Sequence, residues 1–332
     1  MTVGPNVLRS VGLYVACALL APFVFDAGIS RLLGEVLLML AMAQMWNLLA
    51  GYTGLVSIGH QAFVGIGAYV LFFASDSLGI TPYAAVPLAG LAGGLVAIVV
   101  APLLFRLRDA YFSIGIWVFA EILHLFATKS AVLGGTSGVT LRAVQRIDIE
   151  RFGQYSFYIC AAIALAAVLG VYSLMRSRVG LALMAVRDNE LAASSIGIDV
   201  TRNRLIAFAI SAVGCAMAGA THYMTAMFVG ADSAFSVDWV VAMLFIVIIG
   251  GIGTLEGPIV GTLIYFALRE FFAAYFELSG GWYLVAMGLV AIIVMQIAPR
   301  GVWGWIQERR WLTGFVVRRS PSQLAQNEKP IL

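Results

Sequence analysis

Eight ionisable side chains stand inside otherwise apolar runs of this sequence. They are Glu35, His60, Glu121, His124, His222, Glu256, Arg269 and Glu270. A charge at the centre of a lipid bilayer costs about 2.5–3.5 kcal/mol on insertion scales, so such residues mark candidate functional positions. Glu121 and His124 are three residues apart and share one helical face. The two side chains could bind a small cation, relay a proton or only neutralise each other.

The histidines do not indicate a metal site. His60, His124 and His222 belong to different apolar runs, and no HxxxH or HExxH spacing occurs. A single histidine in a Gly-rich helix is more often a hydrogen-bonded structural residue than a ligand; both interpretations stay open for His60. The three cysteines lie in apolar runs without metal or redox spacing, so we interpret them as packing residues.

Two glycine-rich stretches lie beside the apolar runs. The candidates for ligand contact within them are Gly54, Gly59, His60, Gly65, Gly251, Gly253, Glu256, Gly257 and Pro258. Neither stretch has the spacing of a dinucleotide-binding loop, and no GxxxxGK[ST] phosphate loop occurs, so we expect no ATP hydrolysis by this chain. Such glycines serve close helix packing, or break helices so that backbone groups can hold a zwitterion.

Long apolar helices must position these residues. Of the 332 residues 61% are hydrophobic and 11% charged, with a mean hydropathy of +0.96, whereas soluble domains carry about 25% charged residues. We expect an all-α polytopic membrane protein, a bundle of about 8–10 transmembrane helices, some broken or re-entrant. The predicted spans are 11–25, 32–50, 58–75, 83–105, 110–128, 156–175, 205–228, 238–253, 257–276 and 281–298. The net charge of +3 is too small to indicate nucleic-acid binding.

The longest internal polar segment outside one outer loop is 176–204, which contains five arginines. Asp188 can cap a short helix whose first turn contains Asn189 and Glu190, and Gly197 is a natural stop. We expect a small helix parallel to the membrane. From the spacing alone, it could be a solvated loop or a docking element for a cytoplasmic partner.

The distribution of lysine and arginine predicts the orientation. With both termini cytoplasmic, fourteen of the twenty basic residues lie inside and five outside, including Arg31, while Arg269 lies in a span. We interpret the first apolar run as a retained span. The predicted division is a transmembrane domain, 1–300, and a cytoplasmic basic, aromatic tail, 301–332. Within 300–320 we expect an interfacial helix with Trp303, Trp305 and Trp311.

Four stretches resemble one known family. The segment GLALMAVRDNELAASSIGIDVTRNRLIAFAISAVGCAMAGA resembles the cytoplasmic coupling segment of LivM-type permeases, the membrane subunits of ABC importers for branched-chain amino acids. NLLAGYTGLVSIGHQAFVGIGAYV at 47–70 and IGGIGTLEGPIVGTLI at 249–264 are similar to the same family, as is YFSIGIWVFAEIL at 111–123. These matches follow the family's order and together cover most of residues 40–270.

The resemblance implies an importer subunit in the bacterial inner membrane. Its implied partners are two cytoplasmic ABC ATPases, a homologous second permease, an extracytoplasmic binding protein and lipid; ATP would be used by the ATPases, and no cofactor is bound by this chain. The implied coupling residues are Arg187, Asp188, Asn189, Glu190, Ala193, Ile196 and Gly197. The glycine-rich candidates, with Glu121 and His124, would line the translocation pathway.

Two other functions stay open at the level of sequence. In a proton-coupled secondary transporter of small polar solutes, Glu121 and His124 would form the proton relay. An intramembrane enzyme would need a nucleophile and a base, and no such motif is visible. The Gly-rich turn at Gly134–Val139 could line an entrance or be a plain surface turn.

Overall fold

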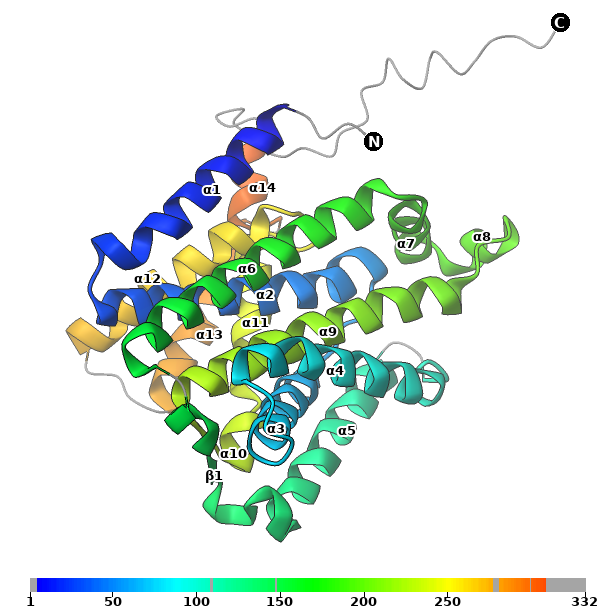
Figure 1. Cartoon of the computed structure of the whole chain (residues 1–332). Helices are drawn as coiled ribbons and strands as arrows, with labels where there is room; N and C mark the ends of the chain where they lie inside the picture. The colour runs from blue at the N-terminus through cyan, green and yellow to red at the C-terminus, as the bar shows by residue number, and fades with distance from the viewer. Residues whose placement is uncertain (1–4, 108–109, 147, 277–280, 299, 309–332) are drawn as a thin grey trace, which may run out of the picture.

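A computed structural model describes residues 5–107, 110–146, 148–276, 281–298 and 300–308 (Figure 1). The long helices are α1 (Pro5–Val24), α2 (Ala27–Thr53), α3 (Gln61–Asp76), α4 (Pro82–Leu104), α5 (Ala110–Lys129), α6 (Ile149–Arg176), α9 (Val200–Ala226), α11 (Asp238–Gly250), α12 (Gly257–Phe276) and α13 (Gly281–Ile297). The short helices are α7 (Arg178–Asp188), α8 (Glu190–Ser195), α10 (Ala231–Ala234), α14 (Gly301–Glu308) and the 3-10 turns Ala131–Leu133, Gly135–Ser137 and Arg142–Arg146.

The predicted all-α membrane fold is confirmed. Every predicted span coincides with one of the ten long helices. Among the described residues, seven helices are long and apolar enough to cross a membrane, and Val11–Val24 and Gln61–Asp76 are shorter apolar helices. The strands in this part of the chain are β1 (Val139–Thr140) and β2 (Phe228–Val229), which pair antiparallel.

Helix α9 lies at the centre of the bundle, packed against α2, α3, α4 and α6. Glycines allow its closest crossing, because a Cβ at Gly67 of α3 would meet the Ala216 carbonyl, and one at Gly219 of α9 would meet that of Val64. The bulkiest fully buried side chains include Trp46, Phe63, Phe112 and Phe208. The core is formed by α9 together with the helices before the polar segment and by residues of α11 and α12.

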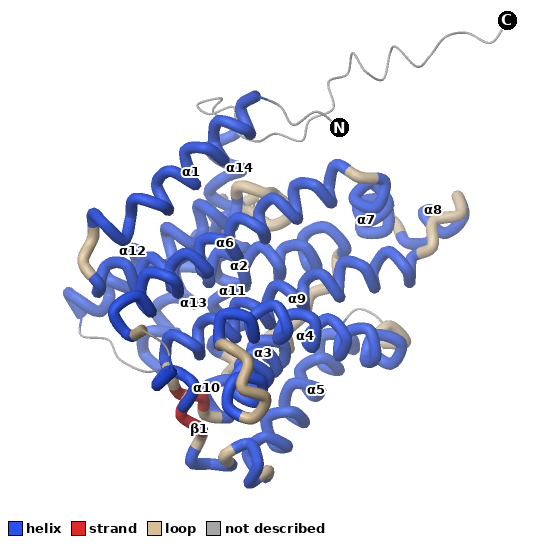
Figure 2. Tube along the Cα trace, in the orientation of Figure 1, coloured by secondary structure: helices blue, strands red, loops and turns tan. Residues whose placement is uncertain are grey.

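The loops gather at two ends of the bundle (Figure 2). At one end lie α7, α8 and the α4–α5 turn; we call it the α7–α8 end (Figure 1). At the other, the α10 end, lie the α1–α2 turn, β1 and α10 (Figure 1). The residues between α11 and α12, 251–256, form what we call the α11–α12 loop.

Helix α2 begins earlier than predicted, at Ala27, and Arg31 is therefore part of the helix. The Asp26 carboxylate accepts a hydrogen bond from the Ile29 amide at 3.0 Å and so caps the first turn. Apolar periodicity alone located only the lipid-compatible portion, because the first two turns carry Ser30 and Arg31. An arginine that was counted as a loop residue thus lies one turn inside a transmembrane helix.

The start of the predicted tail packs on the bundle. Helix α14 contacts α11, α12 and α13. Trp303 is buried and Trp305 is exposed. Trp311 and the rest of the predicted interfacial helix lie outside the described residues.

Candidate functional site

The two glycine-rich stretches meet at the last turns of α2, although about 200 residues separate them. The Asn47 side-chain amide donates to the Thr254 carbonyl at 2.8 Å and its oxygen accepts from the Gly253 amide at 2.8 Å. One turn earlier, Gln44 donates to the Leu255 carbonyl at 2.6 Å. These hydrogen bonds satisfy backbone groups of the α11–α12 loop that lie outside any helix. Helix α2 therefore holds this loop in place.

Arg187 connects this junction to the polar segment. Its Nη1 donates to the Gly51 carbonyl of α2 at 3.0 Å, and its Nη2 pairs with Asp188 at 2.9 Å. A Cβ at Gly54 would lie 3.5 Å from the Arg187 Cγ, and one at Gly253 would lie 3.3 Å from its Nη1. The predicted coupling segment is thus bonded to α2 and lies against both glycine stretches at the α7–α8 end.

The short helix predicted in the polar segment exists, but its cap differs from the prediction. The Asn189 side chain accepts from the Ala192 amide at 3.0 Å and caps α8, whereas Asp188 ends α7. Helix α7 itself was not predicted, because its apolar residues are too few to indicate a span. Glu190 pairs with Arg204 at 2.8 Å and ties α8 to the start of α9.

Exposed apolar side chains lie in α8 and at the residue that follows it. Leu191 is 80% exposed and Ile196 is 77% exposed, whereas Ala193 is buried against the bundle. Gly197 follows with a left-handed φ of 85° and turns the chain toward α9. Beside α8 lies a cavity of about 670 Å³, whose lining includes Gly54, Leu55, Phe105, Glu190, Leu191 and Arg204.

His60 is completely buried and fully hydrogen-bonded. Its Nδ1 lies 2.6 Å from the Ser57 hydroxyl and its Nε2 2.6 Å from the Ser211 hydroxyl, which donates to the Met45 carbonyl at 2.7 Å. This chain of hydrogen bonds joins α2, the start of α3 and α9. In this conformation His60 does not line an open passage, and its role in translocation stays a prediction.

The other glycine candidates lie at close contacts. A Cβ at Gly59 would meet the Ile116 backbone of α5, and one at Gly65 would meet the Phe235 ring. Gly257 begins α12 and would meet the Gly251 carbonyl. Pro258 follows in the first turn of α12, and Glu256 is buried in the α11–α12 loop. These residues are tightly packed against neighbouring protein groups. Their predicted contact with a substrate stays a prediction.

The predicted pair of α5 is present, with a third member. The His124 Nδ1 lies 3.2 Å from Glu121 and its Nε2 lies 2.8 Å from Asp232 of α10. The Asp232 carboxylate is 87% exposed and Glu121 is half exposed. This cluster lies at the α10 end, away from the glycine junction (Figure 1). Sequence reasoning missed Asp232 because 108 residues separate it from His124.

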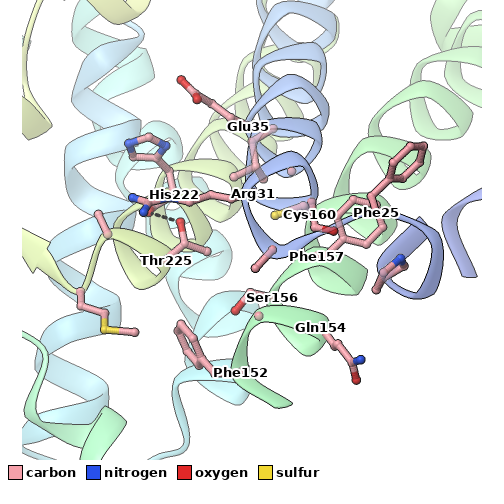
Figure 3. A pocket seen from close by; sticks show the side chains of 18 residues that line it. Phe25, Arg31, Glu35, Phe152, Gln154, Ser156, Phe157, Cys160, His222 and Thr225 are labelled. Atoms are coloured by element: carbon pink, nitrogen blue, oxygen red, sulfur yellow. Dashed lines mark hydrogen bonds between the residues drawn. The ribbon is translucent and has the colours of Figure 1, made fainter. Parts of the chain in front are cut away.

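A second cavity, of about 600 Å³, lies between α1, α2, α6 and α9 at the α10 end (Figure 3). Arg31, Glu35 and His222 contribute polar groups to its lining. Glu35 pairs with Arg269 of α12 at 2.7 Å, and Arg269 also contacts Glu270 at 3.4 Å. Sequence analysis identified the other four ionisable residues, Glu35, His222, Arg269 and Glu270, as lying inside apolar runs. It assigned Arg31 to a loop.

This fold and its sites define a polytopic helical membrane protein with a hydrogen-bonded junction at one end and a charged cavity at the other. Comparison with known sequences makes the class specific. The family described as "Branched-chain amino acid transport system / permease component" matches residues 28–295, and the chain belongs to it. It is a transport subunit with many membrane-spanning helices.

Named relatives agree with this family. The chain is 25% identical over 307 residues to the "High-affinity branched-chain amino acid transport system permease protein LivM" of Salmonella typhimurium and to that of Escherichia coli, covering 85% of this chain and 71% of each relative. It is also 24% identical over 282 residues to a "Probable branched-chain amino acid transport permease protein LivH" of Methanocaldococcus jannaschii, covering 79% of this chain and 87% of that protein. No solved structure matches the chain significantly.

Proposed function

We propose that this chain is the permease subunit of an ATP-binding-cassette importer for branched-chain amino acids or related small amino acids and amides. An extracytoplasmic binding protein would deliver the substrate, and two cytoplasmic ATPases would use ATP. Relatives named both LivM and LivH support a second, homologous permease as its partner. The membrane would be the bacterial inner membrane, with the α7–α8 end and both termini in the cytoplasm.

The single observation that carries the proposal is that α7 and α8 extend from one end of the bundle (Figure 1). Leu191 of α8 and Ile196, which directly follows α8, are exposed apolar side chains, and the Glu190–Arg204 ion pair joins α8 to α9. In α7, Arg187 is bonded to α2 at Gly51. A partner that buries the two apolar side chains can therefore move helices that cross the membrane.

The charges of this end support its cytoplasmic placement. The turn after α4 carries Arg106, and α6 ends at Arg176, followed by Arg178 in α7. Arg202 and Arg204 lie in the first two turns of α9. Basic residues next to the ends of transmembrane helices favour the cytoplasmic side.

The test is a docking measurement on the intact complex. Each apolar side chain of this size contributes about 1.5–3 kcal/mol when a partner buries it, so we expect Leu191→Ser with Ile196→Ser to weaken ATPase binding at least about tenfold. The assay is ATPase co-purified per permease, together with leucine uptake driven by the complex. Both should fall while the amount of inserted permease stays normal.

The matched control is Val132→Ser. Val132 is 84% exposed, more than either docking residue, but belongs to the 3-10 turn Ala131–Leu133 at the α10 end. This variant should retain its ATPase. Normal ATPase recovery and uptake in the Leu191 and Ile196 double variant would contradict the assignment of α8 as the docking helix.

A further inference from the structure

The cavity at the α10 end contains a cation, Arg31, for which the described residues supply no anionic partner. Arg31 lines it from the second turn of α2, and within the described part of the chain Arg31 forms no ion pair. Figure 3 shows its side chain reaching toward His222 and Thr225 of α9. Arg31 itself is exposed, so it stands at the open side of the cavity, and its guanidinium, which cannot lose its proton, can bind an anion there.

An anion of the protein stands one helical turn away but is held elsewhere. Glu35 is four residues from Arg31 on the same face of α2, a spacing that permits an ion pair. Instead, Glu35 turns to Arg269 of α12, with an oxygen 2.7 Å from its Nη1. Among the described residues, the cavity thus offers a cation outside any ion pair and, nearby, a carboxylate with oxygen lone pairs left to accept further hydrogen bonds.

The rest of the lining is mostly apolar. Leu38 of α2, Phe152 and Phe157 of α6, and Phe25 contribute large hydrophobic side chains. The volume of about 600 Å³ lies within the range of about 300–1,000 Å³ that small-molecule sites occupy. Apolar walls with a few placed charges suit a small amphipathic zwitterion better than a bare ion.

We infer that this cavity binds the α-amino acid substrate on its way from the binding protein. Arg31 receives the carboxylate, Glu35 accepts hydrogen bonds from the ammonium, and the aliphatic side chain lies against Phe152 and Phe157. This inference rests on the proposed function, in which the α10 end faces the binding protein. It adds a substrate-entry site in which the orientation of the bound amino acid is specified. This site lies far from the glycine junction at the α7–α8 end.

A phospholipid headgroup with phosphate and ammonium groups shares this zwitterionic chemistry. The two sources differ in what competes for the site. Free leucine is displaced by soluble analogues, whereas phosphatidylethanolamine is retained through purification and depends on the surrounding bilayer. The experiment therefore measures both ligands on the same preparation.

The experiment uses the complete complex in nanodiscs, without the binding protein, and tritiated leucine as the probe. Leucinamide, which lacks the carboxylate, and 4-methylpentanoate, which lacks the ammonium, are the competitors. A hydrogen bond to a charged group contributes about 1.5–3 kcal/mol, so Arg31→Gln should weaken leucine binding about 10- to 150-fold. Leucinamide binding should change little, and Arg31→Lys should retain part of the affinity.

The matched control is Arg142→Gln. Arg142 is an exposed arginine in the 3-10 turn Arg142–Arg146 at the same end of the bundle and does not line the cavity. Its replacement should leave leucine binding unchanged. Equal loss in both variants would indicate a general charge effect and overturn the inference.

Two further outcomes separate the possibilities. If the wild-type complex takes up leucine and Arg31→Gln binds it normally, the inference fails while the proposed function stands. If Arg31→Gln loses co-purified phosphatidylethanolamine by native mass spectrometry yet keeps leucine binding, the cavity is a lipid site and the inference is overturned. A wild-type complex that imports no leucine would refute the proposed function itself.

Discussion

Gly51 is the residue of α2 with the least room for a side chain at the junction with the α11–α12 loop. A Cβ there would lie 2.6 Å from the Gly253 amide nitrogen and 2.8 Å from its Cα, and would also meet the Asn47 side-chain oxygen. Both the loop and the amide that holds it would have to move. We therefore predict that Gly51→Ala separates the two elements.

The expected cost follows from three contributions. Overpacking of a filled interior costs about 1–3 kcal/mol, and each of the two Asn47 hydrogen bonds to the loop contributes about 0.5–1.5 kcal/mol if lost. Replacing glycine by alanine inside a helix stabilises the folded protein by about 0.5–1 kcal/mol, which offsets part of this cost. The net destabilisation is therefore about 1–5.5 kcal/mol.

The assay is thermal unfolding in detergent, followed by size-exclusion chromatography, with Gly170→Ala as the control. Gly170 also lies inside a long helix, α6, and a Cβ there would meet nothing within 4 Å. The control should be stabilised by about 0.5–1 kcal/mol. A Gly51→Ala protein as stable as the Gly170→Ala protein would refute the packing argument.

Three other predictions concern the ends of the bundle. Arg187→Gln should leave insertion intact but reduce substrate moved per ATP hydrolysed, because it removes a charged hydrogen bond of about 1.5–3 kcal/mol to α2; an unchanged ratio would contradict this. His124→Gln should lower stability by about 0.5–3 kcal/mol through loss of its two carboxylate contacts, one to Asp232, and an unchanged melting temperature would show that the contacts contribute nothing. In a cysteine-free background, cysteines at Ser137 and Ser194 should react with impermeant reagents from opposite sides; labelling from one side would disprove the predicted topology.

The helices were predictable from the sequence because lipid imposes a simple pattern. Each apolar run had to be helical to satisfy its backbone groups, and every predicted span was found. The boundaries were less predictable, since polar first turns such as that of α2 depend on a local cap. Helix α7 was missed for the related reason that it lies outside the apolar pattern.

The contacts between distant residues could not be predicted. The sequence identified both glycine stretches, but only the packing of α2 against α11 and α12 brings Asn47 to Gly253. It paired Glu121 with His124 correctly by spacing, and could not supply Asp232. The i, i+4 spacing of Arg31 and Glu35 could have indicated that both lie on one helical face. The predicted span began at residue 32 and left Arg31 outside the helix.

Helix α9 connects the coupling segment to the charged cavity. At one end the Glu190–Arg204 ion pair fastens it to α8, and at the other His222 forms part of the wall of the charged cavity. Its 27 residues span about 40 Å at 1.5 Å per residue, so pivoting by roughly 5° at one end sweeps the other through about 3.5 Å. Such a displacement exceeds the diameter of a water molecule. In the proposed importer, a small tilt of α9 driven at α8 would therefore change the width of the cavity at the α10 end.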